Sequence, residues 1–186
     1  MTRTVLVPYE RFPGWVERFS ARHGEPLVVR DGTAVTLRAP DGAEAAYDEV
    51  EPPNDFGIVL VRRGGYAVGW VEQAELVGHK TGTRYVQGQT KAGGWSQQRY
   101  ARRRANQADA LVGACAEVVG RIVPGGQVVF GGGDQSLVAA VLEQAASRPP
   151  LQLASRWLDV GEPRFVTLQK AVVDARSYVV RLNALA

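Results

Sequence analysis

Short alternating apolar runs dominate the first half of the chain and predict β-strands. The expected strands are 27–30, 33–38, 43–47, 56–63, 66–72, 75–80 and 83–87. Asp31-Gly32 and Asp41-Gly42 separate the early runs, and Asp-Gly is a strong signal for a tight hairpin turn. Apolar residues at helical spacing predict a helix over 11–23 ahead of these strands. The pattern therefore predicts an antiparallel N-terminal meander.

The pattern changes to a helical period after residue 94. Apolar side chains then recur three and four residues apart as far as Ile122, which predicts a long helix over 95–122. Cys115 lies on this stripe and is expected in the core. The remaining elements alternate: strand 128–130, helix 135–147, strand 153–160, helix 164–175 and strand 177–182. We expect one mixed α/β domain over 1–186, with a single sheet and flanking helices.

The bulk composition is that of an ordinary globular protein. A chain of 186 residues is long enough for one well-packed domain. Its single cysteine excludes an internal disulfide, which fits a reducing cytoplasm. The N-terminus lacks the apolar run of a signal peptide, and no window approaches the roughly 20 apolar residues of a membrane span. We therefore expect a soluble, cytoplasmic protein with no membrane partner.

The charge is unevenly distributed, although the net charge of +3 is modest. The segment 76–108 contains no Asp or Glu. It carries seven basic residues: Lys80, Arg84, Lys91, Arg99, Arg102, Arg103 and Arg104. A run rich in Gly and Gln, 87–94, lies inside it. This combination favours a polyanionic partner, RNA being the first candidate, over a merely solvated surface.

The arginines at the start of the predicted long helix are available to such a partner. Arg99, Arg102 and Arg103 fall on the face opposite the apolar stripe, so the core does not require them. Tyr100 lies on the apolar stripe and is expected in the core.

Several kinds of chemistry are disfavoured. His23, His79 and Cys115 lack the spacing of zinc ligands. Four carboxylates in the second half also lack ligand spacing: Asp134, Asp159, Glu162 and Asp174. We therefore expect no metal and no other cofactor. The run 131–133, three glycines between a predicted strand and helix, suits either a phosphate cradle or a tight turn, and we favour the turn.

The run from Gly93 to Arg104 resembles the catalytic loop of eukaryotic and archaeal peptide-chain release factors. Their pattern is Gly-Gly-Gln-Ser, two variable residues, Arg-Phe and further arginines, whereas this chain reads Gly-Gly-Trp-Ser-Gln-Gln-Arg-Tyr-Ala-Arg-Arg-Arg. The chain is still more similar to the bacterial, actinobacterial-type relatives of the Vms-like peptidyl-tRNA hydrolases. The order of its elements through Leu182 is also similar to the catalytic domain of these factors, an α/β unit likened to the ribonuclease H fold.

The resemblance implies hydrolysis of the ester that joins a nascent peptide to tRNA on stalled large ribosomal subunits. The implied partners are rRNA of the large subunit and peptidyl-tRNA, and we expect the protein to be a monomer. Residues 83–98 would form a mobile catalytic loop, in which Gly93 and Gly94 permit close approach of the backbone to the tRNA end. The RNA-binding residues would be Lys80, Arg84, Lys91, Trp95, Arg99, Arg102 and Arg103.

The chain departs from the release-factor pattern at one position. Trp95 stands where those factors have the glutamine that positions the attacking water. The candidates for that role are, in order, Gln97, Gln89 and Gln98. The departure also leaves open a non-catalytic ribosome- or RNA-binding factor with the same fold, and a metal-dependent nuclease is a weaker third alternative.

Overall fold

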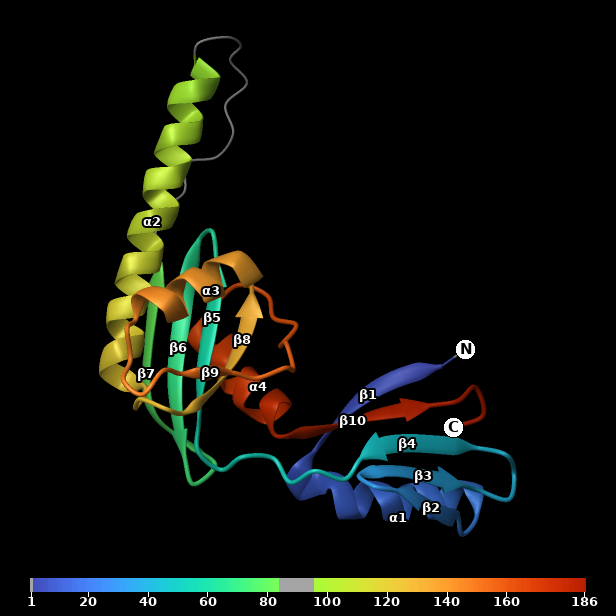
Figure 1. The fold of residues 1–186 in the computed structure, drawn as a ribbon. Helices are drawn as coiled ribbons and strands as arrows, with labels where there is room; N and C mark the ends of the chain where they lie inside the picture. The colour runs from blue at the N-terminus through green and yellow to red at the C-terminus, as the bar shows by residue number, and fades with distance from the viewer. Residues whose placement is uncertain (1, 84–95) are drawn as a thin grey trace. The chain divides into compact units, whose positions relative to one another are not determined.

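The chain folds into two compact units, each with its own sheet (Figure 1). The computed structural model describes residues 2–83 and 96–186, and for residues 96–105 it describes the backbone alone. Unit 1 comprises Met1–Pro53 and Val173–Ala186, and unit 2 comprises Asn54–Val172. The expected mixed α/β composition is confirmed, but the expectation of a single sheet is wrong, since each unit has a sheet of five strands. The likeness to the ribonuclease H fold stays a prediction.

Unit 1 is an antiparallel sheet covered on one face by a helix. Its elements are β1 (Arg3–Pro8), η1 (Tyr9–Arg11), α1 (Phe12–His23), β2 (Leu27–Asp31), β3 (Ala34–Arg38), β4 (Glu44–Asp48) and β10 (Ser177–Leu182). The strand order is β1-β10-β4-β3-β2. Phe12 and Phe19 of α1 are buried against Leu37, Tyr47 and Val180 of the sheet, and this cluster is the core of the unit.

The last strand of the chain lies inside the sheet of unit 1. β10 pairs with β1 through Leu6↔Val179 and with β4 through Leu182↔Ala45. Unit 2 is therefore an insertion between β4 and β10 of unit 1.

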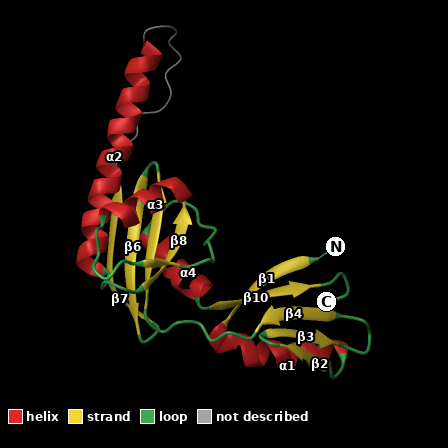
Figure 2. Cartoon of the chain, viewed as in Figure 1, coloured by secondary structure: helices red, strands yellow, loops and turns green. Residues whose placement is uncertain are grey.

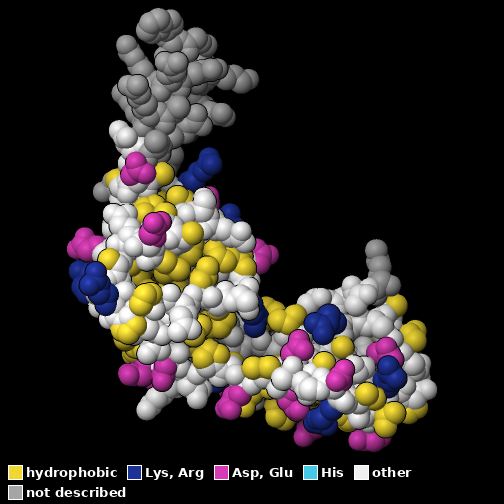
Figure 3. All heavy atoms as spheres, viewed as in Figure 1, with side chains coloured by type: hydrophobic (Ala, Val, Ile, Leu, Met, Phe, Trp, Pro, Cys, Tyr) yellow, Lys and Arg dark blue, Asp and Glu magenta, His cyan; other side chains and the backbone are white. Residues whose placement is uncertain are grey.

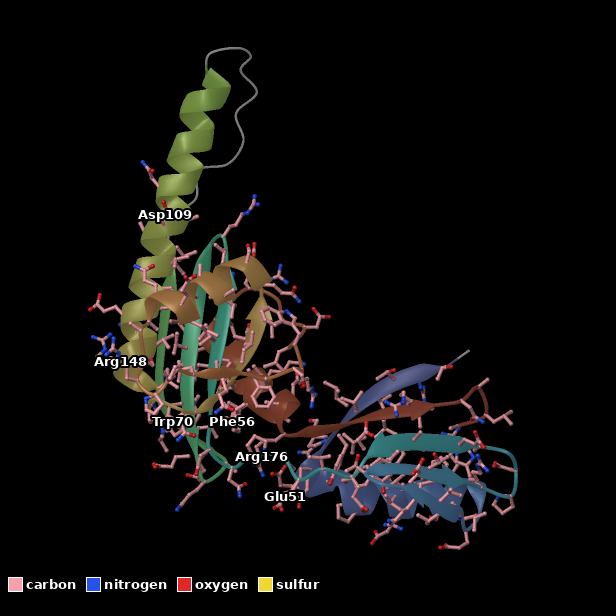
Figure 4. All side chains as sticks on the ribbon, viewed as in Figure 1. Glu51, Phe56, Trp70, Asp109, Arg148 and Arg176 are labelled. Carbon is pink, nitrogen blue, oxygen red and sulfur yellow. The ribbon has the colours of Figure 1, made fainter. Side chains whose placement is uncertain are left out.

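Arg176 fixes the point at which the chain leaves unit 1 (Figure 4). Its buried guanidinium donates to the Pro53 carbonyl at 2.7 Å and to Glu10 Oε1 at 2.9 Å. Burial opposes ionisation of Glu10, but the hydrogen bond from Arg176, a backbone hydrogen bond and the charge of Arg176 together outweigh it, so the pKa of Glu10 lies below its ordinary value.

Unit 2 is a mixed sheet with helices on both faces (Figure 2). Its elements are β5 (Phe56–Arg62), β6 (Gly65–Glu72), β7 (Glu75–Thr83), α2 (Ser96–Ile122), β8 (Val128–Gly133), α3 (Gln135–Gln144), β9 (Gln152–Leu153) and α4 (Phe165–Ala175). The strand order is β7-β6-β5-β8-β9, with β5, β8 and β9 parallel. The predicted meander is thus divided, with β2–β4 in unit 1 and β5–β7 in unit 2.

The two faces of the second sheet are buried by different helices. α2 and α3 share one core cluster with the sheet, which includes Val59, Val68, Leu111 and Val138. α4 packs on the other face, where a Cβ added at Gly69 would lie 3.1 Å from Leu168 Cδ1. Because both faces are covered, the inner strand β5 is apolar at every position from Phe56 to Val61 apart from one glycine.

Two predicted features of the strand pattern need correction. β1 was not predicted. The expected strand 153–160 is wrong beyond its start, since the ladder contains Gln152–Leu153 and later one isolated bridge, Gly132↔Leu158. Between them the chain leaves the sheet, and the Trp157 ring packs against Gly131.

Candidate functional site

Helix α2 is anchored at one end and extends past the sheet at the other (Figure 1). Its 27 residues span about 40 Å. Among the described side chains of α2, Leu111 is the first buried one, and Cys115 and Val119 follow on the same face. The turns from Ser96 to Ala110 therefore precede the packed part of the helix and project roughly 20 Å from it.

Cys115 belongs to this anchor, which confirms its expected place in the core. The side chain is fully buried, and burial raises the pKa of its thiol to about 12. A thiol with that pKa is protonated at neutral pH and cannot act as a nucleophile.

The strand that leads into segment 84–95 is held by two glycines. β7 pairs with β6 up to Gly65↔Thr83. A Cβ at Gly82 would lie 2.5 Å from the Tyr66 ring, and a Cβ at Gly65 would lie 2.5 Å from the Gly82 carbonyl oxygen. Only glycine permits this approach, so both residues hold the end of β7 against β6. Sequence reasoning missed Gly82, because a glycine inside a strand gives no sign of which ring covers it.

One predicted RNA-binding residue has a described side chain. Lys80 is exposed on β7 opposite Val68, and directly opposed residues point to the same face of a sheet. Since Val68 packs in the cluster that includes α2, Lys80 lies on the face that carries the projecting helix.

The other predicted site residues are not tested by the structure. Six lie outside the described residues: Arg84, Gln89, Lys91, Gly93, Gly94 and Trp95. Five lie in the first part of α2, where the helical backbone is described and the side chains are not: Gln97, Gln98, Arg99, Arg102 and Arg103. The predicted loop 83–98 begins at the last residue of β7 and ends in α2, and its central part lies outside the described residues.

The glycine run 131–133 is the end of strand β8, where it pairs with Val59–Val61 of β5, so the expected tight turn is wrong. The helix that follows is capped by Asp134. Asp134 Oδ1 accepts hydrogen bonds from Ser136 N at 3.1 Å and from Leu137 N at 3.3 Å. The Ser136 hydroxyl and these amides lower the pKa of Asp134, so the carboxylate is charged at neutral pH. A phosphate would compete with that carboxylate, which argues against a phosphate cradle at this helix end.

The described residues contain no group of three or more His, Cys, Asp or Glu placed to hold a metal ion. Within the same part of the chain, no helix combines the length and apolar character needed to cross a membrane.

The positive charge of the protein is concentrated in the segment 76–108. It holds seven of the 22 Lys and Arg residues, whereas the remainder of the chain holds 15 of them together with all 19 Asp and Glu. On the face shown in Figure 3, the basic side chains of the described residues are scattered among acidic ones and form no patch. Asp109, on α2, is the first acid after this segment (Figure 4).

A family model for the actinobacteria/chloroflexi VLRF1 release factor matches residues 54–181. The chain belongs to this family. The match contains all of unit 2 and continues into β10, whereas residues 1–53 of unit 1 lie outside it. Membership of the VLRF1 family confirms the resemblance to release factors.

Among solved structures, the chain is similar to an archaeal translation termination factor, aRF1, with 15% identity, a TM-score of 0.46 and coverage of 94% of this chain and 64% of that one. It is also similar to another archaeal protein, with 14% identity, a TM-score of 0.35 and coverage of 94% and 66%. The chain thus spans less than two thirds of either structure, and values this low carry no conclusion about function. A comparison with curated proteins finds no match.

Proposed function

We propose that the protein is a peptidyl-tRNA hydrolase that releases nascent chains from stalled large ribosomal subunits. The observation that carries this proposal is the VLRF1 release factor match, because it covers the whole of unit 2 and includes the glycine-rich segment and helix α2. Translation occurs in the cytoplasm, so we place the protein there, with large-subunit rRNA and peptidyl-tRNA as its partners.

The shape of unit 2 suits a reaction inside a crowded RNA site. The packed half of α2 is fixed to the sheet, and its other half carries the segment's arginines beyond that sheet. Arg99, Arg102 and Arg103 would bind phosphates and thereby orient the factor without reading sequence. Gly93 and Gly94 would let the backbone approach the tRNA end.

The proposed chemistry is attack of an oriented water on the ester carbonyl. The water oxygen forms a bond to the carbonyl carbon, the bond from that carbon to the tRNA 3′ oxygen breaks, and the proton lost by the water passes to the departing 3′ oxygen, which becomes a hydroxyl. Orientation of the reactants supplies about 7–11 kcal/mol in favourable cases. A single N–H donor to the developing oxyanion adds about 3–4 kcal/mol. We propose Gln97 as the first candidate to position the water, with Gln89 and then Gln98 as alternatives.

Trp95 supports a second candidate function. It replaces the glutamine of the release-factor pattern, so a factor that binds the subunit without cleaving the ester has a specific observation in its favour. In either case the indole can stack on a base, a contact worth about 1–3 kcal/mol.

The test uses purified large subunits that carry peptidyl-tRNA. We expect free peptide and intact tRNA after addition of the protein, because the ester alone is cleaved. Gln97→Ala or Gln89→Ala should abolish release while the protein still binds the subunit. Binding with no release by the unchanged protein would support the passive factor, and cleaved tRNA would indicate a nuclease.

A further inference from the structure

Two aromatic rings meet on the surface of unit 2. His79 of β7 and Phe165, the first residue of α4, have ring centroids 4.5 Å apart with an interplanar angle of 33°. Both side chains are exposed, and Phe165 retains 41% of its accessible surface.

The pair lies on the α4 face of the second sheet. His79 is opposite Gly69, and Gly69 faces Leu168 of α4. Lys80 and α2 are on the other face. The pair is therefore a separate feature from the projecting helix, although β7 connects the two. Thr83 follows His79 by four residues, about 13 Å along the strand.

The core of unit 2 does not account for the pair. α4 buries its inner side through Leu168 and Ala171, both fully buried. Phe165 lies one turn before Leu168 and leaves a large part of its ring in contact with solvent. An exposed aromatic ring is an apolar surface that water does not favour, and flat rings of this kind are the usual platform for unpaired bases.

The charges around the pair suit a nucleotide. No acid occurs on β7 after Glu75, and none occurs in the first turn of α4. Arg164 is exposed and directly precedes Phe165. Glu162 is the acid nearest to Phe165 in the sequence. Its carboxylate lies near Gly64, five residues before Gly69, which is the residue opposite His79.

We propose that His79 and Phe165 form a stacking platform for an unpaired base of RNA, with Arg164 binding the adjacent phosphate. The inference rests on the proposed function in one respect, namely that RNA is the partner of unit 2. The platform would contact RNA beyond the reacting end of the tRNA and so help to hold the factor in place.

The experiment measures binding of the full chain to a single-stranded RNA oligonucleotide that contains the fluorescent base 2-aminopurine. Stacking should quench the base. Phe165→Ala and His79→Ala should each weaken binding roughly tenfold, within the range expected for one stacked base. Phe165→Tyr should restore it, because the ring is kept. Arg164→Ala should lower the slope of log affinity against log salt by about one.

Val166→Ala is the matched control, since Val166 is 68% exposed beside Phe165 and has no ring. Circular dichroism on each variant confirms that it is folded. Binding of folded Phe165→Ala and His79→Ala at the level of the unchanged protein would overturn the platform. A docking surface for protein is the other outcome that would overturn it: Val166→Ala and Phe165→Ala would then weaken binding to large subunits equally, with oligonucleotide binding unaffected.

The platform and the hydrolase proposal can fail separately. If quenching depends on both rings but the protein releases no peptide, the platform is supported and the hydrolase proposal is contradicted. If the Phe165→Ala and His79→Ala variants release peptide and bind RNA with unchanged affinity, the hydrolase proposal is supported and the platform is contradicted.

Discussion

At Gly82, a hydrogen atom in place of a side chain lets the Tyr66 ring pack directly against β7. The Tyr66 ring occupies the space that a Cβ at Gly82 would need, with ring atoms 2.5 Å away, and Tyr66 is itself buried. Gly82→Ala should therefore lower the free energy of unfolding by about 1–3 kcal/mol, because the ring must leave its place. Urea denaturation measures the change. Gly161→Ala is the control, since nothing lies within 4 Å of the added methyl there, and equal losses in the two variants would contradict the explanation.

Asp134 is a second residue with a local and measurable effect. Its carboxylate caps α3, so Asp134→Ala should lower the free energy of unfolding by about 1 kcal/mol at pH 7. Asp134→Asn should retain most of that stability, because an amide oxygen also caps a helix.

The pH dependence of this effect follows from the lowered pKa of Asp134. The cap's contribution is complete above the unfolded-state pKa of about 3.9 and is lost as the pH falls through the lower folded-state value. The difference in stability between the unchanged protein and the Asp134→Ala variant should thus shrink in denaturation curves below about pH 4. A difference that stays constant down to about pH 2, well below the unfolded-state pKa, would show that the charge of Asp134 is not involved.

At the scale of elements, the sequence predicted the strands and helices that depend on the local pattern of apolar residues. The strands β5 and β6 and the helices α1, α2 and α4 follow from the spacing of their apolar residues. β1 has a similar alternation, but its partner β10 is more than 160 residues away, and no local signal reveals that pairing. The segment after β9 is rich in apolar residues because Trp157 and Leu158 pack inward. The apolar pattern of a sequence does not distinguish such packing from the pairing of a strand with its neighbour.

The candidate site could be predicted only in part, because a local pattern does not show which distant segments meet. The arginines and glycines of the motif are visible in the sequence. The His79–Phe165 pair joins two segments more than 80 residues apart, and the sequence does not show that these segments meet. The sheet brings them together, because α4 crosses the face on which His79 lies.

The anchoring of α2 leads to a prediction for this element. Leu111 is 2% exposed and is the first buried side chain described along the helix. Leu111→Ala should lower the stability of unit 2 by about 2–5 kcal/mol. If α2 carries the reactive segment, release should fall further than the loss of folded protein explains, because the projecting turns lose their nearest support.

Leu37→Ala provides the comparison for Leu111→Ala. Leu37 is also 2% exposed but belongs to the core of unit 1. This variant should lose a similar amount of stability while the folded fraction releases peptide at the normal rate. Equal effects of the two variants on release per folded molecule would argue against α2 as the carrier of the site.

For the whole molecule, the decisive feature is that unit 2 is inserted into unit 1. All strands of the second sheet and its core cluster come from residues between Asn54 and Val172, so a fragment of residues 54–172 has every partner that its core needs. The sheet of unit 1 needs both ends of the chain, because β10 separates β1 from β4. The fragment 54–172 should therefore fold alone, whereas residues 1–53 should not.

Circular dichroism and urea denaturation of three fragments test this organisation. Residues 54–172 should unfold cooperatively, and residues 1–53 alone should give the spectrum of an unfolded chain. A third fragment, residues 1–53 joined by a short flexible linker to 173–186, should recover a cooperative transition, because the linker restores β10 between its two neighbours. Cooperative folding of residues 1–53 without β10 would show that the sheet of unit 1 does not depend on this inner strand. The family match, which covers unit 2 and continues into β10, would then end in a strand that unit 1 does not need in order to fold.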